Sequence, residues 1–437
     1  MPQLKQLARQ IFHETLAAID IPATMQRKLR RKGTVLVCGD VRVDLRDFER
    51  LRVVAIGKAA HAMVDGLALV LSPFVRLEGV VSAPTPPHKP VAGMKYFVAG
   101  HPVPNAGSWK AAEAILALLK KCNEKTLVFF LLSGGGSALV ELPLDPAQTL
   151  EDVQRVHRVL VTCGAPIDAI NTVRKHLSAV KGGRLAAAAN HATKITVAVS
   201  DVPMGKESAL ASGPTLPDPT TVADAKRIVA EYSLHQKFPP ALQHWIDKGK
   251  MPETPKADAT AFRNSYFLLL LGMDDLFHPA HHAAEGKGFV ACCDNTTDDW
   301  PVEKAAEYLL EQLEELRKTH AGHRVALIAD GEVSSPVTGN GIGGRNSAFV
   351  LACLERIAGK KVAVLSAGTD GIDGNSPAAG AVADGETLER ARAAGLDPSE
   401  AFRQSDAFTF FSKLGDVIVT GPTGNNLRDL RILIAEP

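Results

Sequence analysis

Six short apolar runs recur along the chain, and each ends in glycine together with small polar or charged residues. The runs span residues 53–56, 127–132, 194–199, 324–329, 362–365 and 416–419. Apolar runs of this length, without polar alternation, are typical of strands buried on both faces of a parallel sheet. Open α/β sheets bind ligands at the carboxyl ends of their strands. The recurrence therefore predicts an α/β fold with a ligand site at these strand exits.

The strand at 127–132 leads into a run of small residues. This run comprises Ser133, Gly134, Gly135, Gly136 and Ser137. Three successive glycines allow backbone N–H groups to curl around an anion because no Cβ obstructs them. We therefore predict a phosphate or carboxylate cradle here; the alternative is a tight, flexible turn between a strand and a helix.

Charged residues stand at several of the other strand exits. Lys58 follows the run at 53–56 and precedes a predicted helix, where a lysine is unfavourable unless an anion lies nearby. The alternative is a lysine whose ammonium reaches solvent. Asp201, Glu332 and Asp370 follow three further runs. Each of these carboxylates could bind a ligand, or could simply cap a helix or an Asx turn.

Residues 167–188 show helical spacing and are interrupted by two glycines at 182–183. Asn171, Arg174, Ser178 and Lys181 fall on one face of this segment. The stripe could neutralise phosphates, or it could be a solvated charged face.

The length of 437 residues predicts two domains. Residues 236–260 are rich in proline and lysine and are typical of a linker. We therefore predict domains at 1–240 and 241–437.

The net charge of +1 gives no general attraction to nucleic acid or to an anionic membrane. The amino terminus lacks the apolar core of a signal peptide, and the apolar stretch at 266–271 is too short to span a bilayer. The six cysteines form no C-x-x-C pair, which favours a reducing cytoplasm. The His281–His282 pair is interpreted as a surface turn, not a metal site.

Comparison with known sequence motifs limits the types of reaction that the chain could catalyse. Gly339, Gly341 and Gly344 match G-x-G-x-x-G, but about nine residues separate them from their strand, which disfavours a nicotinamide site. The chain has no G-x-x-x-x-G-K-[ST] and no G-x-S-x-G around Ser137. Phosphoryl transfer fits best, since it needs phosphate cradles (134–136 and 339–344), cations such as Lys58 and Arg345, and a carboxylate-bound metal. Magnesium usually takes one or two carboxylates.

Taken together, the motifs resemble the glycerate 2-kinase family, whose members carry a leucine-rich C-terminal domain known as MOFRL. The resemblance covers nearly the whole chain in the expected order and is weakest at 232–310. It rests on the segments at 132–139, 171–178, 181–186, 200–202, 211–215, 344–346, 366–374 and 423–426.

The resemblance implies two α/β domains, a larger Rossmann-like N-terminal one and a smaller C-terminal one with the MOFRL region at about 322–435, and an active site in the cleft between them. It also implies ATP-dependent phosphorylation of D-glycerate to 2-phosphoglycerate with Mg²⁺. The family's catalytic lysine and arginine correspond to Lys58 and Arg345. Relatives labelled hydroxypyruvate reductase in tartrate utilisation make an NAD(P)H-dependent reductase the alternative.

The combined hypothesis is a cytoplasmic enzyme that binds a nucleotide and a small acid, without nucleic acid or membrane, and it leaves a homodimer open. Asp201 is a candidate for polarising the hydroxyl, and Asp201 and Glu332 are candidates for holding the metal. The residues expected to bind substrate or ATP are Ser133, Gly134, Gly135, Gly136, Ser137, Asn171, Arg174, Lys181, Gly341, Gly344 and Asp370.

Overall fold

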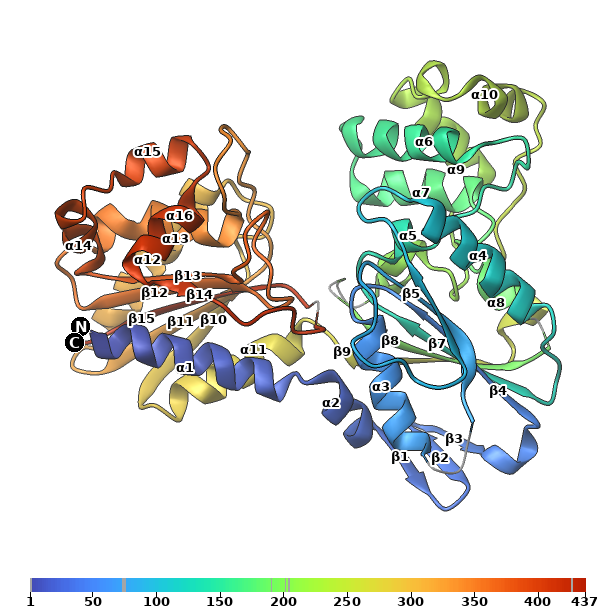
Figure 1. The fold of residues 1–437 in the computed structure, drawn as a ribbon, viewed down its shortest axis with the longest axis horizontal. Coiled ribbons are helices and arrows are strands. Elements are labelled where there is room, and N and C mark those ends of the chain that lie inside the picture. Colours follow the sequence, from blue (N-terminus) through green and yellow to red (C-terminus); the bar gives the residue numbers. More distant parts are fainter. Residues whose placement is uncertain (1, 73–75, 190, 201, 203–204, 426) are drawn as a thin grey trace. The chain divides into compact units, whose positions relative to one another are not determined.

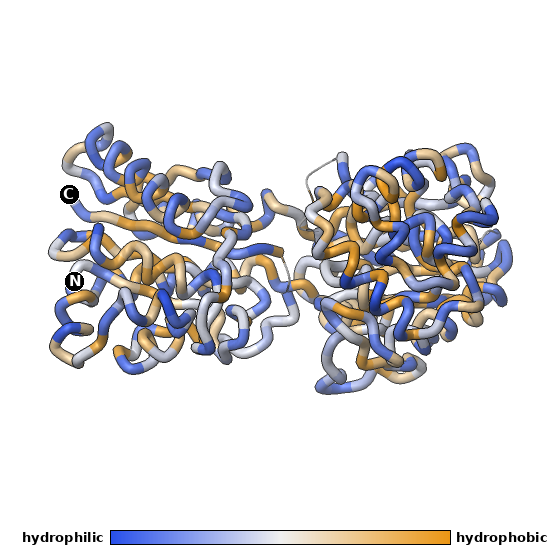
Figure 2. Tube along the Cα trace, turned by 90° about the horizontal axis from the view of Figure 1, so that it is seen from above, coloured by the Kyte–Doolittle hydropathy of each residue, from blue (hydrophilic) through white to orange (hydrophobic). Residues whose placement is uncertain are grey.

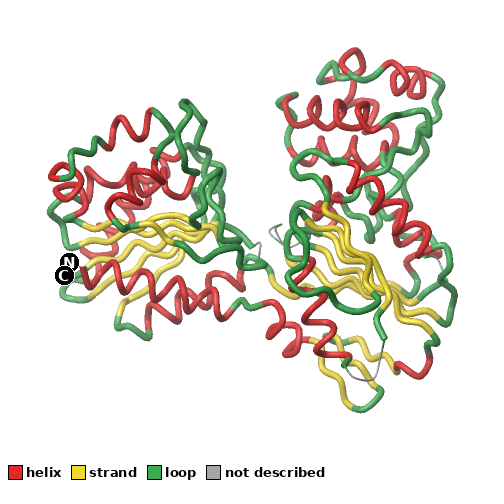
Figure 3. Tube along the Cα trace, in the orientation of Figure 1, coloured by secondary structure: helices red, strands yellow, loops and turns green. Residues whose placement is uncertain are grey.

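The computed structural model describes residues 2–72, 76–189, 191–200, 202, 205–425 and 427–437. The chain divides into two compact units (Figure 1). Residues 21–272 form the unit called here the N-terminal unit, and residues 1–20 with 273–437 form the C-terminal unit. Each unit is an α/β layer structure with a sheet between helices (Figure 3), as the apolar runs predicted.

The predicted domain boundary at residue 240 is wrong for two physical reasons. After the proline- and lysine-rich stretch the chain returns to the first sheet, where β9 (Ser265–Leu271) pairs with β8 (Thr193–Val199). The first helix, α1 (Pro2–Ala18), packs on β12 (Val362–Gly368) and β15 (Asp429–Ala435) of the C-terminal unit. The apolar face of α1 therefore completes the core of a unit that lies far away in sequence.

The N-terminal unit contains a six-stranded parallel sheet with the order β6-β5-β4-β7-β8-β9. All seven residues of β7 are buried, as expected for a strand covered on both faces. Besides β8 and β9, its strands are β4 (Arg50–Ile56), β5 (Glu78–Ala83), β6 (Met94–Val98) and β7 (Thr126–Leu132).

Helices and one small antiparallel sheet surround this parallel sheet. The small sheet consists of β1 (Leu29–Lys32), β2 (Val35–Cys38) and β3 (Val41–Asp44). The helices are α2 (Ile21–Lys28), α3 (Ala60–Leu71), α4 (Ala106–Leu119), α5 (Gly136–Leu139), α6 (Leu150–Thr162), α7 (Ile167–Leu177), α8 (Arg184–Ala188), α9 (Val222–Glu231) and α10 (Pro240–Asp247).

The C-terminal unit contains a mixed six-stranded sheet with the order β10-β11-β15-β12-β13-β14. β15 runs antiparallel to both of its neighbours, β11 and β12, which are therefore parallel to each other. The carboxyl ends of β11 and β12 consequently lie at the same edge as the start of β15. The remaining strands are β10 (Phe289–Asp294), β11 (Arg324–Asp330), β13 (Gly380–Asp384) and β14 (Val417–Ile418).

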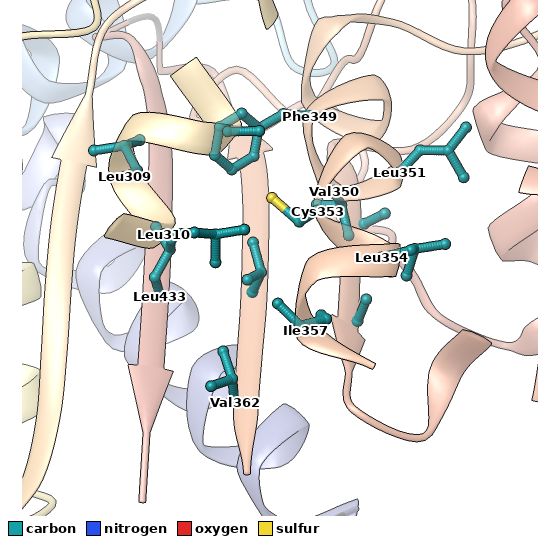
Figure 4. Close-up of a cluster of buried hydrophobic side chains, with 14 of the residues drawn as sticks. Leu309, Leu310, Phe349, Val350, Leu351, Cys353, Leu354, Ile357, Val362 and Leu433 are labelled. Carbon is teal, nitrogen blue, oxygen red and sulfur yellow. The ribbon is translucent and has the colours of Figure 1, made fainter. Parts of the chain in front are cut away.

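Helices cover both faces of this second sheet, with α1 and α11 on one face and α12, α13 and α16 on the other (Figure 1). On the second face, apolar residues of α12 and α13 interlock above the strands (Figure 4). Phe349, Cys353 and Ile357 recur every fourth residue along α13 and are at most 1% exposed. The helices are α11 (Asp274–Glu285), α12 (Val302–Thr319), α13 (Arg345–Ile357), α14 (Thr387–Ala393), α15 (Pro398–Arg403) and α16 (Ala407–Leu414).

The apolar stretches run along the strands inside each unit, and hydrophilic segments lie on the outer helices and loops (Figure 2). Within the described part of the chain, none of the helices combines the length and the apolar character needed to cross a bilayer.

Candidate active site

The strand order of the N-terminal sheet brings two predicted strand exits together. Numbered by their order along the chain, its strands lie in the sequence 3-2-1-4-5-6, and the order reverses between β4 and β7. A crevice opens at the carboxyl ends of the strands at such a switch point, and this is where open α/β sheets bind ligands. Lys58 follows β4 and Ser133 follows β7, so the two exits meet at this crevice.

Direct hydrogen bonds join the two strand exits. The amide of Lys58 donates to the carbonyl of Gly134 over 3.0 Å, and the amide of Ala59 donates to Ser133 Oγ over 3.0 Å. Gly57 has a φ of +133°, and a Cβ at this position would overlap Ser133 Oγ. Only glycine therefore allows the β4 exit to pass so close to the loop of residues 133–137, called here the first glycine loop.

The first glycine loop leaves a row of backbone donors uncommitted. Among the described residues, no protein acceptor takes the amides of Gly134, Gly135, Gly136 or Ser137. Gly135 adopts a φ of +82°, which favours glycine. Successive main-chain N–H groups in such a turn form an anion-binding concavity. The loop therefore has the geometry of the predicted cradle.

A strained turn at Ala211 and Ser212 contacts the first glycine loop. Ser137 Oγ lies 2.7 Å from Ser212 Oγ, which donates to Asn171 Oδ1 over 3.0 Å. Ala211 and Ser212 both have positive φ values, 51° and 59°, which are costly for residues other than glycine. Asn171 was predicted from the stripe, and the structure gives it this supporting contact. Ser212 belongs to the motif at 211–215, but it was not predicted as a site residue because the motif does not show its contact with Ser137.

The basic stripe does not exist as one helix face, and this part of the prediction is wrong. Helix α7 ends at Leu177, and Ser178 continues in an extended conformation. Lys181 is only 1% exposed, and its Nζ donates to Glu141 Oε2 over 2.6 Å. The ammonium that was expected to bind substrate is therefore buried in an ion pair.

Glu141 is the hub of this buried pair. It follows α5 closely and also accepts hydrogen bonds from Ser178 Oγ and His157 Nε2. Burial opposes the ionisation of Glu141, but Lys181 and His157 outweigh it and hold the pKa of Glu141 at about 2. Arg174 faces the same carboxylate, although burial lowers the pKa of this guanidinium. Sequence reasoning missed Glu141 because it follows an apolar segment without any motif.

Arg345 stands at the corresponding edge of the C-terminal sheet. Its Nε donates to Asp429 Oδ2 over 2.5 Å, and its Nη1 lies 2.8 Å from Glu332 Oε2. Burial would lower the pKa of Arg345, but these two carboxylates raise it above its usual value. The guanidinium is therefore held in a fixed position while about a third of the side chain stays exposed.

The glycine-rich segment 339–344, called here the second glycine loop, contradicts the predicted second cradle. The amide of Gly341 donates to Gln404 O and that of Ile342 to Asp406 Oδ1, each over 2.9 Å. The amide of Gly343 donates to Asn375 Oδ1 and that of Gly344 to Ser347 Oγ, so the amides of residues 341–344 all have acceptors. These amides, including those of Gly341 and Gly344, are committed to the protein and do not form a phosphate cradle.

The backbone amides at the start of α13 also donate to an acceptor within the protein. The carboxylate of Asp373 accepts from the amides of Asn346 and Ser347, each over 2.9 Å, and from Ser347 Oγ. Asp373 is 1% exposed, and burial raises its pKa above the usual value. An internal carboxylate therefore occupies the position that an anion would take at this helix terminus.

Two of the remaining candidate carboxylates, Asp370 and Glu332, lie near the Arg345–Asp429 pair. Asp370 Oδ1 accepts from the amide of Ile372 in an Asx turn, and Gly368 lies between Asp370 and Asp429. Glu332 is engaged by Arg345. Asp201 lies outside the described residues.

Among the described residues, one group of three side chains could hold a metal ion, namely His281, His282 and Glu285, whose ligand atoms lie within 4.8 Å of one another. The two histidines lie in α11, not in the predicted turn. Glu332 is not part of this cluster, and its role as a metal ligand stays a prediction.

A parallel sheet whose switch point carries uncommitted amides and a lysine defines an α/β enzyme that handles anionic substrates. Two family models match the chain, a domain of unknown function, DUF4147, over residues 7–247 and the MOFRL family over residues 325–429. The chain belongs to the glycerate 2-kinase family with a C-terminal MOFRL domain, as the sequence motifs predicted.

Individual relatives agree with this assignment. The chain is 36% identical to D-glycerate 2-kinase of Thermotoga maritima over 88% of this chain and 91% of the relative. It is also 35% identical to an Agrobacterium vitis protein named as a hydroxypyruvate reductase, over 98% of this chain and 94% of the relative. The crystal structure of a glycerate kinase from Thermotoga maritima matches all of both chains with a TM-score of 0.84 and 33% identity.

Proposed function

We propose that this protein is a glycerate 2-kinase that transfers the terminal phosphoryl group of ATP to the 2-hydroxyl of D-glycerate. The observation that carries the proposal is the row of uncommitted amides at 134–137 beside Lys58. Phosphoryl transfer depends mainly on positioning and on electrostatic stabilisation of the phosphate oxygens. Amides that are already oriented, together with an ammonium, supply both.

In this proposal the first glycine loop binds an anionic group, either a phosphate of ATP or the carboxylate of glycerate. Lys58 and Arg345 act on the transferring phosphoryl group. The carboxylates of Asp429 and Glu332 hold Arg345 in place. Binding of Mg²⁺ would neutralise phosphate charge; Asp201 remains its candidate ligand, whereas Glu332 would first have to release Arg345. Cytoplasmic location and a homodimer stay predictions.

NAD(P)H-dependent reduction of hydroxypyruvate is the second candidate, because a relative carries that name. In a dinucleotide-binding fold the G-x-G-x-x-G turn directly follows the first strand of the sheet. Here that strand is β4, and the turn after it reads Gly57-Lys58-Ala59-Ala60. The matching motif instead lies in the C-terminal unit, where its amides are committed. The geometry therefore favours the kinase.

One experiment separates the two candidates. Product formation is followed with ATP and Mg²⁺ across D-glycerate, L-glycerate and tartrate, and NAD(P)H oxidation is followed with hydroxypyruvate in the absence of ATP. We expect ADP and 2-phosphoglycerate in equal amounts with D-glycerate and no cofactor oxidation. Cofactor oxidation without ATP-dependent phosphorylation would replace the kinase proposal with the reductase.

A further inference from the structure

A histidine that the motifs did not single out lies at the first glycine loop. His101 follows β6 by three residues, so it extends from the same edge of the parallel sheet as Lys58 and Gly135. A Cβ on Gly135 would lie 3.0 Å from His101 Cδ2, 3.2 Å from its Nε2 and 3.5 Å from Lys58 Cγ. The imidazole, the lysine stem and the glycine loop therefore converge on one point.

His101 is an exposed residue, and two of its ring atoms lie next to Gly135 of the first glycine loop. Partial burial, and then the nearby Lys58 ammonium, lower the pKa of His101 below its usual value of 6.5. Among the described residues, Lys58 is the charged group that shifts this pKa. At neutral pH the ring is therefore an uncharged imidazole that can accept a proton.

Phosphorylation of an alcohol releases the proton of its hydroxyl group, and a side chain such as an uncharged imidazole can accept it. A general base must lie within hydrogen-bond reach of the hydroxyl proton and be unprotonated at the working pH. The uncommitted amides and Lys58 would hold the anionic groups of the substrates within a few ångströms of the ring.

We propose that His101 is the general base of the reaction, an inference that rests on the proposed kinase function. A ring nitrogen of His101 takes the proton of the 2-hydroxyl of glycerate as its oxygen forms the new O–P bond. The bond between the γ-phosphorus and the bridging oxygen breaks, and its electron pair leaves with ADP. The imidazolium then returns the proton to water, so that the net products are 2-phosphoglycerate, ADP and one proton.

The test compares His101→Gln with a matched control, His191→Gln. His191 is also an exposed histidine, but it precedes β8 and so lies near the opposite edge of the sheet. Initial rates are measured from pH 5.5 to 9 with each substrate varied in turn. We expect kcat of His101→Gln to fall by about 10²–10⁴-fold, with the KM for ATP changed less than about threefold and the thermal midpoint unchanged. His191→Gln should match the unaltered protein.

The pH profile distinguishes a base from a structural residue. In the unaltered protein kcat/KM should rise with pH through the lowered pKa of His101 and level off by neutral pH. The acidic limb should vanish in His101→Gln, and added imidazole should restore part of the rate of His101→Ala. An unchanged kcat and acidic limb would overturn the proposal, and so would an effect confined to the KM for ATP, which would make His101 a phosphate ligand.

The same measurements keep the two proposals apart. If the unaltered protein does not phosphorylate glycerate, the kinase function fails and the role of His101 fails with it. If the unaltered protein is active but His101→Gln behaves like His191→Gln, only the role of His101 fails.

Discussion

The two glycine-rich loops look alike in sequence but differ in what their amides do. Both follow a buried strand and precede a helix. In the first glycine loop the amides of residues 134–137 have no acceptor among the described residues, whereas in the second those of residues 341–344 all donate to protein atoms. An anion can therefore satisfy the first loop, but it would have to displace internal acceptors from the second.

The difference lies in the neighbours of each loop, not in its glycines. The second loop packs against residues 404–406 and 373–375, which supply a carbonyl, an amide oxygen and carboxylates. Gly341 is required there because a Cβ would collide with Asp406. The first loop has hydroxyl groups behind it and Lys58 and His101 beside it. Glycine therefore serves different purposes in the two loops. In the second loop it allows close packing against neighbouring segments, and in the first loop it leaves the backbone amides accessible.

The largest effect is expected from Glu141→Gln, which breaks the buried ion pair between Glu141 and Lys181. Breaking a buried ion pair leaves Lys181 uncompensated and typically costs about 3–5 kcal/mol. Chemical denaturation should show this loss, and Glu141→Gln combined with Lys181→Met should recover most of it. Glu151→Gln, an exposed change on α6, is the control.

The pH dependence of the same variant gives a second check. The pKa of Glu141 is about 2 in the folded protein, below its ordinary value of 4.5. The ion pair therefore stabilises the fold above pH 4.5, and this stabilisation is lost as the pH falls towards 2. Glu141→Gln should lack this loss. Equal acid sensitivity in both proteins would show that the ion pair does not stabilise the folded protein.

Next in size is the loss of either cation. Removal of one electrostatic donor at a phosphoryl-transfer site costs about 10²–10³-fold in rate, and we expect this for Lys58→Ala and for Arg345→Ala in the ATP-coupled assay. Lys110→Ala, an exposed lysine on α4, should retain full activity. Near-normal turnover in both test variants would remove their proposed roles.

Alanine substitutions compare the two loops directly. Gly135→Ala should cost about 1–2 kcal/mol, because its backbone is left-handed, and it should also reduce kcat because the methyl group presses on His101. Gly341→Ala should lower the thermal midpoint through overpacking worth about 1–3 kcal/mol while the catalytic parameters of the folded enzyme stay unchanged. Reversed outcomes, with the catalytic loss in Gly341→Ala, would assign the anion to the second glycine loop.

The smallest effect is expected from Asp373→Ala, which opens the start of α13. Loss of this cap should cost about 1 kcal/mol, equivalent to about 2–4 °C in a unit of this size. Sulfate should recover part of the midpoint in the variant but not in the unaltered protein, because the freed amides can then donate hydrogen bonds to the anion. Sulfate stabilisation of equal size in both proteins would mean that Asp373 does not close this site.

Much of the fold could be predicted because buried parallel strands read as continuous apolar runs. The strand exits at Lys58 and Ser133–Ser137 could be found in the same way, since each polar group directly follows its strand. The family assignment rested on motifs of this kind. Spacing along the chain was a weaker guide, because it does not show which segments pack together. For this reason the predictions of an accessible Lys181 and of a domain boundary at residue 240 were wrong.

The sequence by itself determined the strands, the glycines and the charged residues at their ends, because these depend on neighbours along the chain. Only the tertiary structure decided which groups are accessible. Pairing of Lys181 with Glu141, capping of α13 by Asp373, and the meeting of His101 with Gly135 all join segments separated by more than 25 residues. A buried charge or amide takes whichever partner the fold brings within reach, and that partner cannot be read from local pattern.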